Sequence, residues 1–537
     1  MDPGLRRGDG LKNGRRIDLA AFFFDGWRTV MKSVWVLLLS FCCASAVSAE
    51  TWHVDSERGD DARSGISPED AWRTLARVQK AELKPGDTVL LMSGSVWREP
   101  LLLTRSGLAD APITVARSGK GAWPRVEAGG IAENAVEIRN ADNIVLSGIE
   151  ITNKGEGATL RRGVFVNEVD FGVANNIVLR DLYIHDVNGT NARKDNGGIV
   201  FSALGPTVPT RFEGITIERN IVWRVDRSGI AGISDQVSVA RWFPSRFVVI
   251  RDNVLEDIGG DGIVPRGADG ALIEHNIVRH AAARSGDYSA GVWQWSTDNS
   301  LIQLNEAAFT HGIKDGQGFD SDFNSRRTTL VYNFSHDNEG GFLLLCAPVK
   351  RDAADNLGNE GTSVRLNVSY NDRERIFQIA GASQALIERN VVHAGEGEVQ
   401  MVAATWWEGW SQGIAFRNNW FGTRGIARYG YETGRTNGHY VLGDGFPSPL
   451  ELRFSDNIYA GGHANVPPDE GAKLRDERVA REAQWDVPVL DPSKPDDLPD
   501  FLKRHRAWMM DMLARELGHR PVLELPKLMA PDDWRRR

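Results

Sequence analysis

A short phrase recurs along most of this chain: an apolar residue, two further residues and an asparagine. Its first clear copy spans residues 217–220 and its last spans residues 454–457. A fixed phrase at intervals of 23 to 39 residues predicts a solenoid, because each copy holds strands too short to bury a face alone and stacking makes the core continuous. We expect these asparagines to form an internal ladder that satisfies backbone groups of the turns. They are Asn220, Asn253, Asn276, Asn305, Asn333, Asn367, Asn390, Asn418 and Asn457.

A second repeat appears when the strands that follow the asparagines are aligned on their leading glycine. The residue after that glycine is apolar in every coil. Because side chains alternate across a strand, this residue should point into the core and the next one to solvent. No 3.6-residue apolar rhythm lies between the strands, which favours an all-β parallel β-helix over a solenoid that contains helices. The predicted internal column is Ile199, Ile230, Ile263, Val292, Phe319, Phe342 and Phe377.

The sequence predicts one β-helix domain with a cap at each end. Residues 85–462 are expected to form the β-helix, and residues 50–84 an N-terminal cap with a helix from about residue 67 to about residue 81, because Ser67 can cap it and Pro68 suits its first turn. Residues 463–537 are expected to form a C-terminal cap with one helix, since the open ends of solenoids expose strand edges. That helix should span residues 501–517 and bury Leu502, Trp508, Met509, Met512 and Leu513.

The amino-terminal 49 residues have the pattern of a secretory signal behind an over-extended segment. Met31 and Lys32 precede an apolar run over residues 34–39, and a small-x-small site ends at Ala49. We take Met31 as the true start and expect cleavage after Ala49. The run is too short to span a membrane. We therefore expect a secreted or periplasmic protein without a membrane span, and a monomer.

Charge and cysteine usage narrow the partners. Residues 1–49 carry seven Lys or Arg and four Asp or Glu, so the net charge falls from −9 to −12 without them. A net acidic chain argues against nucleic acid as a partner. The mature chain keeps only Cys346, which excludes an intramolecular disulfide. Because Cys346 follows three leucines, we expect it to be a buried apolar residue.

The opening segments of the mature chain add to the stacked coils. They are Trp52-His53-Val54-Asp55, Gly59-Asp60-Asp61, Leu83-Lys84-Pro85-Gly86-Asp87 and Gly94-Ser95-Val96-Trp97-Arg98. Over residues 50–462 the chain resembles the right-handed parallel β-helix superfamily of pectate lyases, polygalacturonases and chondroitinase-like enzymes. The resemblance implies a right-handed coil and a carbohydrate substrate. The motif set of the polygalacturonases is not intact here, so the resemblance implies no pectinase activity.

Candidate catalytic groups concentrate in residues 315–322. If Phe319 points inward, Asp320 and Asp322 both face solvent on one strand, with α-carbons about 6 to 7 Å apart. Glycosidases place two carboxyl groups at such separations around the scissile bond. The turns that enter this strand and the next add Asp315 and Glu339. The predicted catalytic residues are Asp320, Asp322, Asp315 and Glu339.

The neighbouring coils predict a groove beside these carboxylates. Trp293 and Trp295 fall at positions equivalent to Asp320 and Asp322, and tryptophan faces can stack on the apolar faces of sugar rings. A loop with Trp406, Trp407 and Trp410 either walls the groove or packs on itself. The predicted substrate-binding residues are Asp261, Arg266, Trp293, Trp295, Lys314 and His336.

Three functions fit this pattern. The favoured one is hydrolysis of a glycosidic bond in a polysaccharide or oligosaccharide by two of the aspartates, which requires no cofactor. The alternative is a Ca²⁺-dependent polysaccharide lyase or uronate epimerase, with Asp315, Asp320, Asp322 and Glu339 as oxygen ligands and Lys314 or Arg266 as the base. The third is a non-catalytic glycan-binding β-helix. No His and Cys spacing suggests zinc.

Overall fold

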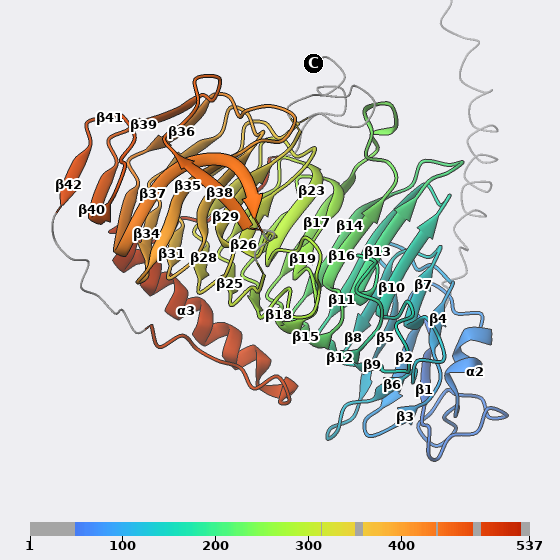
Figure 1. Ribbon diagram of the computed structural model, residues 1–537. Coiled ribbons are helices and arrows are strands. Elements are labelled where there is room, and N and C mark those ends of the chain that lie inside the picture. Colours follow the sequence, from blue (N-terminus) through green and yellow to red (C-terminus); the bar gives the residue numbers. More distant parts are fainter. Residues whose placement is uncertain (1–48, 313, 349–357, 437–438, 476–484, 528–537) are drawn as a thin grey trace, which may run out of the picture. The chain divides into compact units, whose positions relative to one another are not determined.

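The computed structural model describes residues 49–537 except 313, 349–357, 437–438, 476–484 and 528–537 (Figure 1). The predicted signal peptide and the start at Met31 lie outside the described residues. No helix within the described part of the chain is long and apolar enough to cross a membrane.

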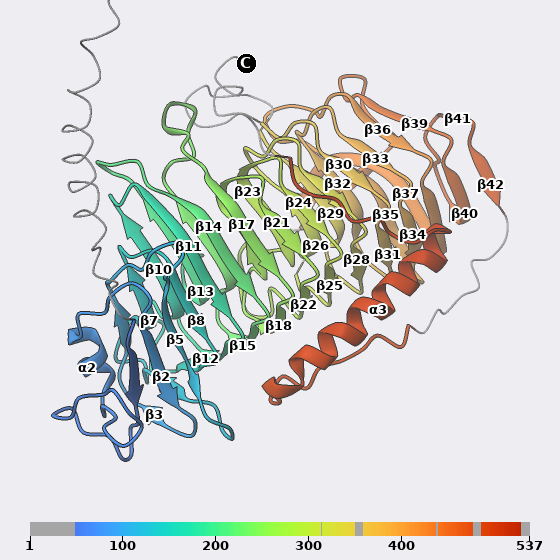
Figure 2. The same cartoon turned by 180° about the vertical axis from the view of Figure 1, so that it is seen from behind.

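The strands form three parallel stacks, which we call the site stack, the flank stack and the third stack (Figures 1 and 2). Every pairing between named strands is parallel except that of β37 with β38 (His439–Asp444). The site stack contains β4 (Leu101–Leu103), β7 (Asn134–Arg139), β10 (Arg162–Val169), β13 (Gly197–Leu204), β16 (Ser228–Ser234), β19 (Ile263–Val264), β23 (Val292–Asp298), β26 (Gln317–Ser321), β29 (Gly341–Cys346), β32 (Arg375–Ala380), β35 (Glu398–Thr405) and β37 (Trp420–Thr436).

The other two stacks complete each coil. The flank stack contains β3 (Val96–Trp97), β6 (Arg125–Glu127), β9 (Glu150–Asn153), β12 (Tyr183–Val187), β15 (Ile221–Val225), β18 (Val254–Ile258), β22 (Ile277–Arg279), β25 (Glu306–Ala308), β28 (Phe334–His336), β31 (Val368–Tyr370), β34 (Val391–Ala394), the start of β37, β40 (Ile458–His463) and β42 (Lys473–Arg475). The third stack contains β1 (Thr51–Val54), β2 (Thr88–Met92), β5 (Ile113–Ser118), β8 (Ile144–Ser147), β11 (Val173–Arg180), β14 (Arg211–Glu218), β17 (Ser245–Arg251), β20 (Arg266–Asp269), β21 (Leu272–Glu274), β24 (Leu301–Gln303), β27 (Thr329–Val331), β30 (Ser363–Arg365), β33 (Leu386–Glu388), β36 (Ile414–Arg417), β39 (Leu452–Ser455) and β41 (Asp469–Glu470).

The asparagine ladder is confirmed, with one correction. Each ladder amide from Asn220 to Asn419 donates to the side-chain oxygen of the next asparagine at 2.9–3.1 Å. The eighth member is Asn419, not Asn418. The residue before every ladder asparagine has a left-handed backbone with φ between 50° and 59°, and Asn418 occupies that turn position. The phrase has its usual length in this coil, from Phe416 to Asn419, and the prediction took the first of two adjacent asparagines.

The predicted internal column is also confirmed except at one position. Pairings run from Ile199 through Phe319 as expected, and Phe319 then pairs with Leu343, which pairs with Phe377. Phe342 was wrong by one residue, because Gly341 pairs with Gln317 rather than with Gly318 and has a φ of 121°. All seven side chains of the observed column are fully buried.

The amino-terminal helix is shorter than expected. Helix α2 spans Leu75–Lys80, and the Thr74 hydroxyl accepts a hydrogen bond from the Arg77 amide as its N-cap. The predicted first turn at Ser67 and Pro68 is not helical, because Trp72 forms a parallel bridge with Val54 and so requires an extended backbone.

The carboxyl-terminal helix forms as predicted but does not cap the open end. Helix α3 spans Leu498–Leu517, follows the 3₁₀ turn η2 (Pro495–Asp497), and lies along the coils on their outer side (Figures 1 and 2). Met509 and Met512 belong to one apolar cluster with Tyr332 and Val368. Strands β41 and β42 extend the stacks beyond residue 462. The apolar side of α3 therefore packs against apolar side chains on the outside of the coils.

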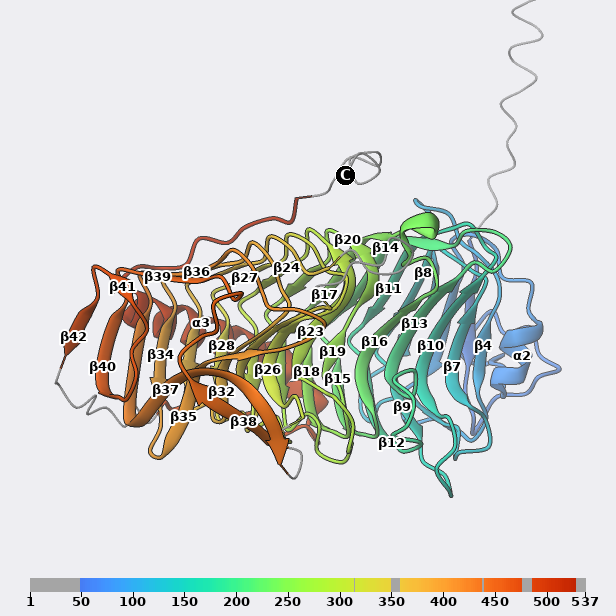
Figure 3. The same cartoon turned by 45° about the horizontal axis from the view of Figure 1, so that its top comes forward.

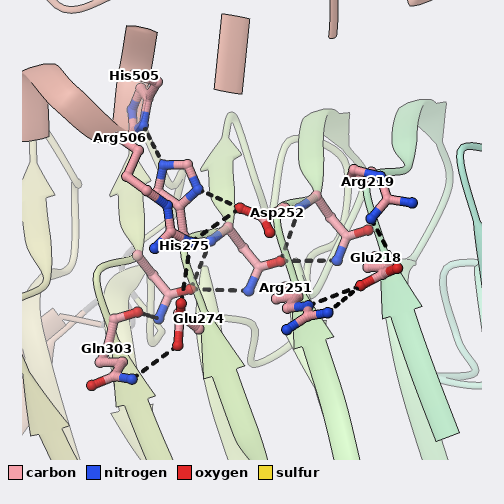
Figure 4. Close-up of polar contacts among 12 residues, drawn as sticks. Glu218, Arg219, Arg251, Asp252, Glu274, His275, Gln303, His505 and Arg506 are labelled. Carbon is pink, nitrogen blue, oxygen red and sulfur yellow. Dashed lines mark hydrogen bonds and ion pairs between the residues drawn. The ribbon is translucent and has the colours of Figure 1, made fainter. Parts of the chain in front are cut away.

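A polar seam fixes α3 in register with the coils (Figure 4). His505 Nδ1 lies 3.2 Å from His275 Nε2, and Arg506 donates to the carboxylates of Asp252 and Glu274 at 3.2 and 3.1 Å. His505 Nε2 lies 2.7 Å from Glu306 Oε2, and both side chains are fully buried.

Candidate active site

One pocket of about 570 Å³ on the site stack contains the predicted carboxylates. Asp320 lies on β26, Asp322 follows the end of that strand, and Asp315 lies in the turn that enters it. The lining residues are Lys194, Tyr288, Ala290, Trp293, Trp295, Asp315, Asp320, Asp322, Phe323, Leu344, Cys346, Gln378, Ala380, Thr405, Trp406, Trp407, Arg435 and Tyr440.

The strand register brings Asp320 beside Trp293, as the sequence predicts. Asp320 pairs with Trp293 on β23 below it and with Leu344 on β29 above it. Its side chain does not face open solvent, however, because only 2% of the residue is exposed. Asp315 and Asp322 are both partly exposed. Asp315 and Asp322 are therefore the more accessible carboxylates of the pocket.

Burial and mutual repulsion favour the protonated forms of these acids. Burial, together with the charge of Asp322, raises the pKa of Asp315 to about 7. Burial and the charge of Asp322 also raise the pKa of Asp320 well above its usual value. Burial raises the pKa of Asp322 as well, but hydrogen bonds from the Cys346 thiol and the Phe323 amide oppose that shift. Asp322 thus has donors that stabilise its anion.

Asp261 is beneath the pocket rather than in it, which corrects its predicted contact with the sugar. It is fully buried, and its carboxylate binds Arg227 at 2.8 Å, Lys194 at 3.0 Å and the Trp293 indole N–H at 3.1 Å. Lys194 also donates to the Tyr288 carbonyl at 3.0 Å. Asp261 therefore orients Lys194 and Trp293, which do line the pocket.

Four other predicted site residues do not line this pocket. Glu339 is exposed and accepts from the Gly312 amide at 2.7 Å. Lys314 is exposed, and Arg266 stacks on the Trp295 ring at 4.0 Å. His336 is buried on the flank stack, 2.8 Å from Asp337.

The pocket includes groups that sequence reasoning missed. Gln378 occupies the column position of Asp320 two coils later, through Leu344, so the strand alignment could have found it. Arg435 and Tyr440 come from the antiparallel β37–β38 hairpin, which reaches across the site stack (Figure 3). The Tyr440 ring lies 4.3 Å from the Arg435 guanidinium and 4.6 Å from that of Arg375. No repeat marks this hairpin or the turn with Lys194.

Part of the tryptophan-containing loop after β35 lines the pocket. Trp406 and Trp407 line the pocket and are 55% and 39% exposed, so their faces are available to a ligand. Trp410 instead packs edge-on against Trp406 and Tyr431. Trp293 is only 4% exposed, so the open indole faces in the pocket belong to Trp406 and Trp407 rather than to Trp293.

The candidate metal ligands differ from the predicted oxygen set. The structure gathers ligand atoms of Asp320, Asp322 and Cys346 within 4.8 Å of one another. Glu339 is outside the pocket and is no part of this group. Cys346 is buried as predicted, but its thiol is a polar partner that donates to Asp322.

Comparisons with known proteins support the fold. A family model described as a right-handed β-helix region matches residues 126–307. The chain has the right-handed parallel β-helix fold. A solved structure with this β-helix is the GH136 lacto-N-biosidase from Eubacterium ramulus, with a TM-score of 0.59 and 24% identity over 84% of this chain and 71% of that chain.

This chain spans a smaller share of each of its curated relatives. A lacto-N-biosidase from Bifidobacterium longum subsp. longum is 29% identical over 432 residues, which is 62% of this chain. The chain spans about a quarter, 26%, of that relative. An alpha-1,3-galactosidase A from Akkermansia muciniphila is 31% identical over 64 residues, which is 12% of this chain and 11% of that protein.

Proposed function

We propose that this β-helix is a glycoside hydrolase that cleaves an oligosaccharide in the pocket on the site stack. The observation that carries the proposal is that Asp315, Asp320 and Asp322 converge in one pocket that also has exposed tryptophan faces. Asp315 is the general acid, because its raised pKa keeps it protonated near neutral pH. Asp322, which accepts two hydrogen bonds as an anion, is the base or nucleophile.

The other pocket residues have supporting roles in this proposal. Asp320 is buried in the same pocket, and burial with the charges of Asp322 and Asp315 favours its protonated form, so it is assigned no proton-transfer step. Lys194, Arg435 and Tyr440 donate to sugar hydroxyls, and Trp406 and Trp407 stack on sugar faces. No step requires a cofactor.

The likeness to lacto-N-biosidases supports an oligosaccharide as the substrate class. We further propose that the protein acts as an exported monomer, with residues 1–49 removed after Ala49, and that it does not bind nucleic acid. We propose one β-helix domain over residues 85–462, which β1 extends on the amino-terminal side and β41 and β42 extend on the carboxyl-terminal side. The mass of exported protein and its elution volume in gel filtration test these proposals.

Two observations favour hydrolysis over the alternatives. The bases named for the lyase, Lys314 and Arg266, do not line the pocket. A glycan-binding module requires the tryptophans but not three acids of which one is buried, since burying acids costs free energy.

A glycan panel tests the proposed reaction. The protein is incubated with lacto-N-biose-containing oligosaccharides, galactosides and uronate polymers, with and without EDTA, and both new reducing ends and the ultraviolet absorbance of unsaturated products are followed. We expect new reducing ends without that absorbance and without loss in EDTA. Unsaturated products would instead establish the lyase alternative.

The pH dependence of kcat/KM tests the role of Asp315. A general acid must be protonated, so the rate should fall as pH rises through the pKa of Asp315, which is about 7. We expect an alkaline limb near pH 7 that disappears in Asp315→Asn, whose residual rate should be flat with pH in that range. An unchanged alkaline limb in the variant would assign the acid role to another group.

Trp406→Ala tests the stacking wall. Trp406 is 55% exposed, so the loss of its indole should weaken substrate binding without disturbing the carboxylates. We expect KM to rise about tenfold, as loss of about 1.4 kcal/mol of stacking implies, with kcat within a factor of two. Trp223→Ala on the flank stack is the matched control and should leave KM unchanged. Equal losses of kcat in both variants would contradict a binding role.

A further inference from the structure

The floor of the pocket places a thiol among carboxylates. The Cys346 thiol, at the end of β29, donates to Asp322 Oδ1 at 2.7 Å. A carboxylate oxygen of Asp320 and one of Asp322 lie with Cys346 Sγ inside a 4.8 Å span. Acid and base chemistry on a sugar requires two carboxyl groups and no sulfur. The cluster therefore contains a group, the Cys346 thiol, that hydrolysis does not require.

An independent observation indicates that a ligand belongs here. Asp320 is 2% exposed and lines the pocket, yet its Oδ1 has no hydrogen-bond partner within the part of the chain that the structure describes. Leaving a buried carboxylate oxygen without a partner is costly, and such groups in native structures are normally explained by a bound water, ion or ligand. A cation seated between Asp320, Asp322 and Cys346 would satisfy this oxygen.

The donor set selects the class of cation. Ca²⁺ takes six to eight oxygen ligands, and two carboxylates with a thiol do not fit it. Zn²⁺ binds Cys sulfur and Asp oxygen, is usually four-coordinate, and leaves one position to water when the protein supplies three ligands. Thiolate ligands also favour Zn²⁺ over Mg²⁺ and Mn²⁺. We propose that Asp320, Asp322 and Cys346 form a site for a thiophilic divalent cation such as Zn²⁺, and that its occupation inhibits the enzyme.

The chemistry of binding is a proton-for-metal exchange. The Cys346 S–H bond and the O–H bond of the protonated Asp320 carboxyl break, both protons leave to solvent, and metal–sulfur and metal–oxygen bonds form, with no change of oxidation state. Asp322 then exchanges its hydrogen bond from the thiol for a bond to the metal. Because the proposed hydrolase uses Asp322 as base or nucleophile, the bound metal removes that group from the reaction. The inhibitory consequence thus rests on the proposed function, whereas metal binding does not.

Cobalt spectroscopy tests the site without any substrate. Co²⁺ replaces Zn²⁺ in such sites and gives intense visible bands when tetrahedral and a near-ultraviolet charge-transfer band when bound to thiolate. We expect both in the full-length protein at one Co²⁺ per chain, and displacement of Co²⁺ by Zn²⁺. Cys346→Ala should lose the charge-transfer band. It should also bind Zn²⁺ at least about tenfold more weakly by calorimetry, because even partners of metal ligands contribute that much.

Two further variants and three possible outcomes keep the proposal falsifiable. Cys346→Ser keeps the volume of the side chain and should also lose the band, which separates ligand loss from misfolding. Asp110→Asn removes an exposed acid and should leave binding unchanged. Zn²⁺ binding that is equally tight in Cys346→Ala, a Co²⁺ spectrum without the thiolate band, or no binding at millimolar Zn²⁺ would each overturn the site.

The activity assay separates this site from the proposed function. Zn²⁺ should inhibit hydrolysis by the wild type at the concentrations at which it binds, and inhibition of Cys346→Ala, relative to its own rate, should need at least about tenfold more Zn²⁺. A protein that binds Co²⁺ through thiolate but hydrolyses no glycan would refute the hydrolase and leave the metal site standing. An active enzyme that Zn²⁺ does not inhibit would refute the inhibitory metal site and leave the hydrolase proposal standing.

Discussion

Asp322→Asn is expected to lower kcat about 10²- to 10⁴-fold on a proven substrate, the usual contribution of a positioned acid or base. Asparagine keeps the shape of the side chain but cannot act as base or nucleophile. The Tm should change little, because Asp322 is partly exposed and ends a strand whose other partners remain. Steady-state kinetics with a chromogenic glycoside and calorimetry measure both quantities.

Glu339→Gln is the informative comparison. The sequence pattern grouped Glu339 with the three aspartates, whereas the structure leaves it exposed and outside the pocket. We expect this variant to keep near-normal kcat. If Asp322→Asn retained activity while Glu339→Gln lost it, the catalytic pocket would have to be moved to the turn before β29.

Glu306→Gln is expected to destabilise the protein by about 3 to 5 kcal/mol, the cost of removing one partner from a buried ion network. Glu306 is fully buried between Arg279, His336 and His505. Burial opposes its ionisation, but these three groups outweigh burial and hold the pKa of Glu306 well below its usual range. Without its carboxylate, Arg279 is left as a buried charge. Urea denaturation measures the loss.

An exposed ion pair between α3 and the residues that follow it provides the control. Asp511 contacts Arg520 at 3.0 Å, and both side chains are more than half exposed, so Asp511→Asn should change stability by less than about 1 kcal/mol. A loss below about 1 kcal/mol for Glu306→Gln would mean that the network contributes nothing net to the docking of α3.

The pH dependence of this network has a definite sign. A carboxyl with a depressed pKa contributes stability above its unfolded pKa, which is lost as pH falls through the folded value. His336 acts in the opposite direction, because Asp337 and Glu306 outweigh burial and raise its pKa to about 9. Its contribution is complete below the unfolded histidine value and is lost as pH rises toward 9. The wild type should therefore lose stability on both sides of this window.

Local patterns allowed much of the β-helix to be predicted. The repeat of an apolar residue and an asparagine encodes a turn in which one residue takes a left-handed backbone and the next donates to its neighbour in the adjacent coil. Such information lies within a few residues of each position. The ladder position was misassigned at Asn418 because a second asparagine follows it directly, and the local pattern was insufficient where a glycine shifted the register, as at Gly341.

The candidate site likewise combines residues that local patterns group with surroundings that come from distant segments. Asp315, Asp320 and Asp322 lie within eight residues on one strand and its turns, so alternation could group them from sequence. Their environment comes from distant segments, with Lys194 from an earlier turn, Cys346 from the next coil and Tyr440 from a hairpin about 120 residues onward. These segments cover Asp320 and change it from a predicted surface group into a buried one.

By itself the sequence determined the solenoid, its ladder, its internal column and the strand that holds the carboxylates, because each depends on periodic and local patterns. Only the tertiary structure decided that Asp261 supports the pocket from beneath, that Glu339 and His336 lie outside it, and that Cys346 joins the acids. Burial, charge pairing and pKa depend on segments far apart in the chain, and no short-range pattern records which of them meet.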